Sequence, residues 1–216
     1  MKGNVPRRLS TVISEFSTRV SETRALVADV YSWSIPTPPS SRPLINRRRR
    51  DSLTALAFLQ AFAAWEAFLE EAFILYLIGQ QAPRGRKISR LGFPPTSTAA
   101  YEWVSDGRDY ATWSPDKVKP RAERFFRGGR PFSPALSRRT FLLRNMTTVR
   151  NAIAHESARA QQRFESLVRN ELGTVPPRTT VGSFLAATKP GTTPPISFVD
   201  YYLNELSHMA QEIVPN

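Results

Sequence analysis

The hexapeptide RNAIAH, residues 150–155, contains three side chains that together could act on a phosphate ester. A histidine with an ordinary pKa of about 6.5 can donate or accept a proton at neutral pH. An arginine adds a permanent charge and planar donors that match phosphate oxygens. Metal-free cleavage of RNA needs a base for the 2′-hydroxyl proton, an acid for the leaving 5′-oxygen and a cation beside the phosphate. Arg150, Asn151 and His155 are therefore candidate catalytic residues.

The spacing of apolar residues predicts that this hexapeptide lies on an amphipathic helix, which we expect to run from about residue 137 without a break to Leu172. At about 100° per residue, four apolar residues fall within about 40° of the first of them and should face the core. They are Leu142, Met146, Val149 and Ile153. The opposite side carries Arg144, Thr148, Asn151 and His155. A solvated polar face is also the usual outcome for such a helix, so the row has a purely structural alternative.

Each chain has only one histidine in this setting, whereas the reaction has two proton-transfer roles. A two-fold dimer that brings two copies of this face together would place two histidines in one cleft. The chain's other histidine, His208, lies on an expected C-terminal helix without neighbouring arginine and asparagine. We expect no functional role for it.

The rest of the sequence predicts an all-α bundle of four or five long helices with irregular loop insertions, in a single domain of residues 1–216. We expect a core of about 50–172 and flanking helices at 7–32 and 197–213. A central helix should begin at Asp51 or Ser52, either of which can cap it, and end near Ile78.

Three connecting segments are expected to be largely irregular because they are rich in glycine and proline or only weakly periodic. Residues 79–97 should form a loop. The segment that follows should hold at most one short helix, at about 115–127. Residues 173–195 should form a loop or a small hairpin.

The apolar segment 53–79 is long enough to suggest a membrane span, but it contains Glu66, Glu70 and Glu71. Each acidic residue near the centre of a bilayer costs roughly 2.5 to 3.5 kcal/mol. We therefore expect a buried central helix and no membrane. The N-terminus lacks an apolar core and a cleavage signal for secretion, which predicts a cytoplasmic protein.

The charge of the chain points to a polyanionic partner, with nucleic acid favoured over a membrane surface. Its formal net charge is +12, and only five of its 30 basic residues are lysines. This arginine bias could also follow from GC-rich coding alone. Candidate RNA-backbone contacts are Arg47, Arg48, Arg49, Arg50, Arg138, Arg139 and Arg144. Solvated basic surface is the alternative for them.

Thiol chemistry is excluded, because the chain has no cysteine and therefore no disulfide, thiolate nucleophile or cysteine-based zinc site. With only two histidines, a histidine-rich metal site is not expected either. The sequence predicts neither a metal nor a cofactor.

Arg150 and Asn151, followed after three residues by His155, resemble the R-x4-6-H motif of the HEPN superfamily, which often opens with Arg-Asn. The segments AAWEAFLEEAF (63–73) and ATWSPDKVKPRAERFF (111–126) are similar to the RiboL-PSP type of HEPN domain. The resemblance covers roughly residues 50–170. It implies a helical bundle that dimerises through its motif helices and cleaves RNA without a metal, leaving a 2′,3′-cyclic phosphate.

The same resemblance assigns roles to individual residues. Arg150 would stabilise the phosphate, Asn151 would position it, and His155 would be the acid and base. Glu66 would be the acidic residue that the preceding long helix contributes to the site, and Glu70 is the alternative. Either could instead form a structural ion pair with Arg150. This sequence departs from the family in having Glu156 and Ser157 where a glycine commonly follows the histidine, which alters the local backbone that orients His155.

The family further implies a prokaryotic toxin or defence effector that acts on RNA as a homodimer and has an antitoxin or inhibitor protein as a possible partner. Two alternatives stay open. The chain could be a non-catalytic HEPN module that binds RNA, nucleotide or protein. It could also be a basic DNA-associated or scaffolding bundle in which the hexapeptide is a coincidence.

Overall fold

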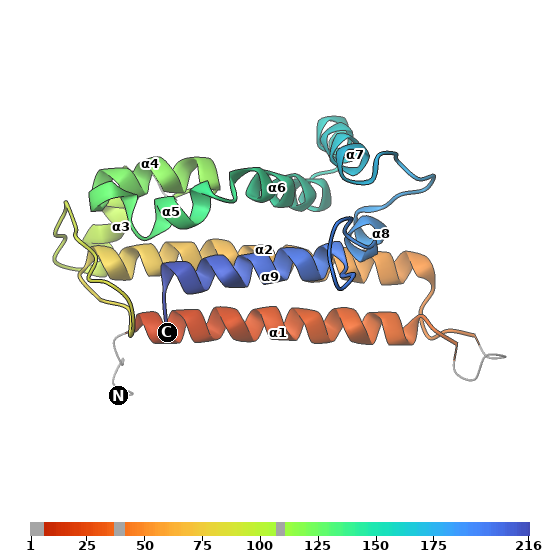
Figure 1. Cartoon of the computed structure of the whole chain (residues 1–216), viewed down its shortest axis with the longest axis horizontal. Coiled ribbons are helices and arrows are strands. Elements are labelled where there is room, and N and C mark those ends of the chain that lie inside the picture. The colour runs from red at the N-terminus through yellow and green to blue at the C-terminus, as the bar shows by residue number, and fades with distance from the viewer. Residues whose placement is uncertain (1–6, 37–41, 107–110) are drawn as a thin grey trace. The chain divides into compact units, whose positions relative to one another are not determined.

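The computed structural model describes residues 7–36, 42–106 and 111–216, and the regular secondary structure of these residues is helical, without a β-strand (Figure 1). This confirms the predicted all-α class. The described α-helices are α1 (Leu9–Trp33), α2 (Arg47–Leu77), α3 (Ser97–Ser105), α4 (Pro115–Phe125), α5 (Phe132–Ser137), α6 (Thr140–Ala154), α7 (Ala158–Leu172), α8 (Val181–Ala186) and α9 (Phe198–Ile213). A short 3-10 turn, Arg127–Gly129, separates α4 from α5.

The chain groups into two compact units, each built from several stretches of sequence. The first unit comprises residues 1–18, 64–143 and 206–216, and the second comprises residues 19–63 and 144–205. Helices α1, α2, α6 and α9 contribute residues to both units. The single domain expected from the sequence stays a prediction.

The first unit has an aromatic core around Phe73 of α2. The ring of Phe73 lies 4.9 Å from that of Phe126, 5.0 Å from that of Phe132 and 5.5 Å from that of Trp113, measured between centroids. These contacts hold the short helices α4 and α5 against α2. The expectation of at most one short helix after residue 97 is therefore wrong, because tertiary packing stabilises helices too short to show a clear period.

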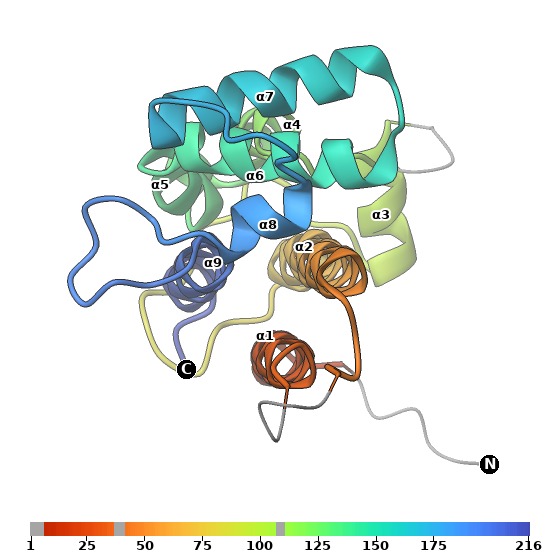
Figure 2. The same cartoon turned by 90° about the vertical axis from the view of Figure 1, so that its right-hand side faces the viewer.

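The second unit has a chain of ring contacts that links four helices. Phe164 of α7 meets Phe184 of α8 edge-on, and Phe184 stacks on Phe198 of α9 with centroids 4.3 Å apart. Tyr202 of α9 then contacts Phe58 of α2 at 5.8 Å. Helix α8 lies between α7 and α2 (Figure 2). These packing contacts order a helix where the sequence predicted a loop or hairpin.

Thr180 and Ser183 also fix the start of α8, because they form a capping box. The Thr180 hydroxyl accepts from the Ser183 backbone N–H, and the Ser183 hydroxyl accepts from the Thr180 N–H. Two backbone donors at the helix start are thereby satisfied within this short segment.

Helix α2 begins at Arg47, four residues before the expected start at Asp51. The side-chain oxygen of Asn46 accepts from the Arg49 N–H at 2.9 Å, so Asn46 caps the helix. Asp51 is buried, only 5 % exposed, and its carboxylate accepts from the Arg50 guanidinium and the Thr180 hydroxyl. It fixes α2 to the loop before α8 instead of capping α2.

By length and composition, α2 could cross a membrane, and half of its most apolar window is buried inside the protein. Core helices meet the same test, so this single helix is weak evidence for a membrane.

Candidate functional site

The helix that carries the hexapeptide ends at Ala154, so the expected unbroken helix to Leu172 is wrong. Ser157 has extended backbone angles, and its hydroxyl accepts from the Ala160 N–H at 3.2 Å, which caps the new helix α7. The apolar period continues past the break, but a good N-cap inside the pattern starts a second helix. In Figures 1 and 2, α7 crosses over α6.

His155 sits at the break. Its backbone N–H still donates to the Asn151 carbonyl at 2.9 Å, which continues the helical hydrogen-bond pattern of α6 by one residue. Its side chain is exposed. The backbone that aims the imidazole is therefore fixed on one side by α6 and on the other by the Ser157 cap.

The buried face of α6 is rotated from the one expected. Met146 and Val149 are fully buried as predicted, whereas Leu142 and Ile153 are only half-buried. The face turns towards two further buried residues, Leu143 and Asn145. Asn145 can be buried because its amide donates to the Glu171 carboxylate at 2.9 Å. The sequence pattern missed this partnered polar residue.

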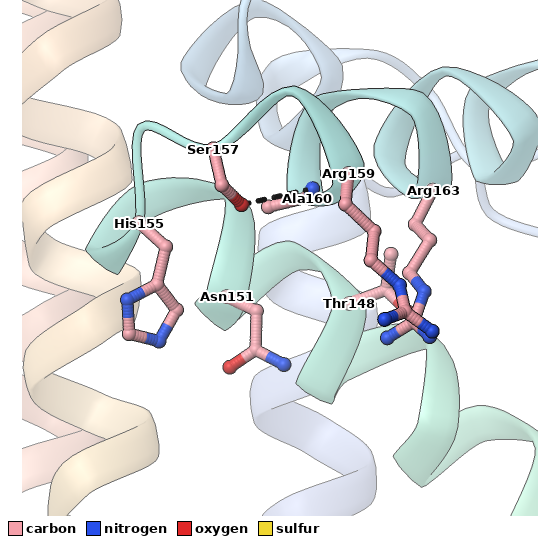
Figure 3. A pocket seen from close by; sticks show the side chains of 7 residues that line it. All are labelled: Thr148, Asn151, His155, Ser157, Arg159, Ala160 and Arg163. Atoms are coloured by element: carbon pink, nitrogen blue, oxygen red, sulfur yellow. Dashed lines mark hydrogen bonds between the residues drawn. The ribbon is translucent and has the colours of Figure 1, made fainter.

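A pocket of about 140 Å³ lies between α6 and α7 within the second unit. Its lining residues are Thr148, Asn151, His155, Ser157, Arg159, Ala160 and Arg163. Figure 3 shows His155 at one end, Asn151 in the middle, and the guanidinium groups of Arg159 and Arg163 at the end near Thr148. No carboxylate lines this pocket. It presents cations and neutral hydrogen-bonding groups, a combination suited to an anion.

Arg150, Asn151 and His155 come together at this pocket. His155 and Asn151 line it, and half-buried Arg150 donates from Nη1 to the Asn151 Oδ1 at 3.2 Å. This bond occupies the amide oxygen of Asn151, so its NH2 group is left as a donor. Arg150 thus orients Asn151 in this structure and adds positive charge beside the pocket.

Arg159 and Arg163 line the pocket but are not among the site residues predicted from the sequence. On an unbroken helix both would lie beyond His155, and Arg159 would be about 16 Å from Thr148 along the axis. Because α6 ends at the break and α7 crosses back over it, both side chains line the pocket. Their spacing of four residues places them on one face of α7 and was the available signal.

The four arginines at the start of α2 belong to the second unit but lie outside the pocket. Arg50 pairs with Asp51 at 2.9 Å and lies over the ring of Tyr31, and Arg47 approaches Asp51 at 3.8 Å. Arg48 and Arg49 are exposed. None of these four lines the pocket, and they occupy the first turn of a helix instead of a loop.

Two other predicted groups lie apart from the pocket lining. In the first unit, Arg138 and Arg139 approach the carboxylate of Glu212 at 3.9 Å and 2.9 Å, which neutralises part of their charge. In the second unit, Arg144 is exposed on α6. RNA contacts by these residues stay predictions.

Glu66 and Glu70 belong to the first unit, and neither lines the pocket. Both are half-buried on α2. Burial raises the pKa of the Glu70 carboxyl. Their participation in a site with His155 stays a prediction. Within residues 7–36, 42–106 and 111–216 there is also no cluster of metal-ligating side chains.

Comparisons with protein-family models, curated proteins and solved structures found no match to this chain. The functional interpretation therefore depends on the sequence motif and on the pocket.

Proposed function

We propose that the chain is a metal-independent endoribonuclease of the HEPN type that cleaves single-stranded RNA. One observation supports this most: His155 and Asn151 share a pocket with two arginines and no carboxylate, while Arg150 is bonded to Asn151. A phosphodiester is an anion that such a pocket can bind, and His155 is a group that can move a proton at neutral pH.

The reaction uses the ribose 2′-oxygen as the nucleophile. This oxygen loses its proton to a base and attacks phosphorus, the bond from phosphorus to the 5′-oxygen breaks, and an acid protonates that oxygen. The products are a 2′,3′-cyclic phosphate and a 5′-hydroxyl. His155 transfers a proton, the Asn151 NH2 group donates to a phosphate oxygen, and the Arg150 guanidinium stabilises the negative charge that develops on the phosphate oxygens. DNA lacks the nucleophile.

A homodimer supplies the second proton-transfer group. Each pocket contains one histidine, and His155 is exposed at the pocket's end, where a second copy of the chain can approach. A two-fold contact would place both imidazoles on one substrate. From the resemblance, we further propose a cytoplasmic toxin or defence effector held in check by an inhibitor protein.

Incubation with a single-stranded RNA in excess EDTA tests this function. We expect the purified protein to cut the RNA and to leave the DNA strand of the same sequence intact, because only RNA carries the 2′-hydroxyl. Gel electrophoresis of end-labelled strands measures both. A requirement for Mg²⁺, equal cutting of DNA, or RNA binding without any cleavage would contradict the proposal.

A further inference from the structure

We infer that Arg159 and Arg163 form a separate subsite for a backbone phosphate next to the scissile one. This inference rests on the proposed ribonuclease function. It assigns the two ends of the pocket to different phosphates of the same strand, with His155 at the reacting one.

The first support is the uncompensated charge of this arginine pair. Elsewhere in the described chain, Arg7 pairs with Glu71 and Arg139 with Glu212. Among the described residues, Arg159 and Arg163 form no ion pair with a carboxylate. The two acidic residues between them and the end of the helix have other partners: Glu165 accepts from Gln161, and Glu171 accepts from Asn145 and pairs with Lys189.

Two like charges four residues apart destabilise a helix when nothing neutralises them. Arg159 and Arg163 both line the pocket, so an anion that enters it would meet both guanidinium groups. A phosphate suits them because each guanidinium can donate two parallel hydrogen bonds to its oxygens.

The second support is the distance along α6. Thr148 and His155 are seven residues apart, and a rise of 1.5 Å per residue separates them by about 10 Å along the helix axis. In Figure 3 the arginines lie at the Thr148 end and His155 at the other. A phosphate within hydrogen-bond reach of the imidazole would therefore not also sit in the fork of the two arginines.

A strand that follows α6 would place one phosphate beside His155 and a neighbouring phosphate on Arg159 and Arg163. Such a contact fixes the position of the strand without selecting its sequence. The arginine pair should therefore favour oligonucleotides over a dinucleotide, whose only phosphate is the scissile one.

The test compares Arg159→Gln and Arg163→Gln with Arg169→Gln, which removes one exposed charge from another face of the same helix. We expect each pocket variant to lower kcat/KM for an eight-nucleotide RNA by about tenfold, the loss of one charge-assisted contact. For a dinucleoside monophosphate, kcat/KM should stay unchanged. Arg169→Gln should match the wild type on both substrates. An equal loss on both substrates, or no loss on either, would overturn the inference.

Binding separates a failure of this inference from a failure of the proposed function. Fluorescence anisotropy with an eight-nucleotide RNA in which every 2′-oxygen is methylated requires no cleavage. Each pocket variant should weaken binding and flatten the salt dependence of log Kd by about 0.7 per lost phosphate contact. If the protein binds this strand in that way but cuts no RNA, the subsite stands and the ribonuclease proposal fails. Unaltered binding and salt dependence would contradict the subsite itself.

Discussion

Replacing His155 with alanine is expected to lower the rate of RNA cleavage by at least about 100-fold, because positioned proton transfer contributes roughly 10² to 10⁴ in rate. The side chain is exposed at the end of α6, so its loss should leave the fold intact. Single-turnover cleavage of a labelled RNA in EDTA measures the effect, and thermal unfolding followed by circular dichroism checks the fold.

His208→Ala is the matched control, since it removes the chain's other exposed histidine from the first unit. We expect it to cleave at the wild-type rate. A mixture of Arg150→Ala and His155→Ala chains, unfolded and refolded together, should regain part of the activity if two subunits share one site. Wild-type activity in the His155→Ala variant would show that the imidazole takes no part in the reaction.

Gly182→Ala is expected to lower the free energy of unfolding by about 3 kcal/mol, at the upper end of the usual cost of overpacking. A Cβ atom at this position of α8 would lie 1.8 Å from the backbone carbonyl oxygen of Asp51 in α2. The Asp51 oxygen belongs to the backbone, and the position of a Cβ atom is fixed by its own backbone. Neither atom could therefore move away by rotation of a side-chain bond. Urea unfolding followed by circular dichroism measures the loss.

Gly173→Ala provides the comparison at the end of α7, where no atom lies within 4 Å of the added Cβ. Its only cost comes from placing an alanine in the left-handed backbone conformation, at φ 74°. This should lower the free energy of unfolding by about 1 kcal/mol. Equal losses in the two variants would show that α8 does not pack against α2 as closely as described.

The long helices could be predicted from the sequence because their apolar stripes follow the helical period. The expected helix at 7–32 is Leu9–Trp33, and the one at 197–213 is Phe198–Ile213. The start of α2 was placed too late. Four arginines look like a loop in sequence, but arginine is a good helix former and Asn46 supplies the cap.

The candidate site could be predicted only in part. The motif identified Asn151 and His155, which line the pocket, and Arg150 beside it. Arg159 and Arg163 were missed because the apolar period passes through Ala160 and Phe164 as if α6 continued. Ser157 carries the local signal for the break, but a serine inside a periodic pattern does not show by itself that the chain turns back.

The ends of the RNA fragments test the central claim most directly, because they record which oxygen attacked phosphorus. Mass spectrometry of the products formed in EDTA should show a 2′,3′-cyclic phosphate on the upstream fragment and a 5′-hydroxyl on the downstream one. A 3′-hydroxyl upstream with a 5′-phosphate downstream would mean that water attacked the phosphate, and would contradict cleavage by the 2′-hydroxyl at the His155 pocket.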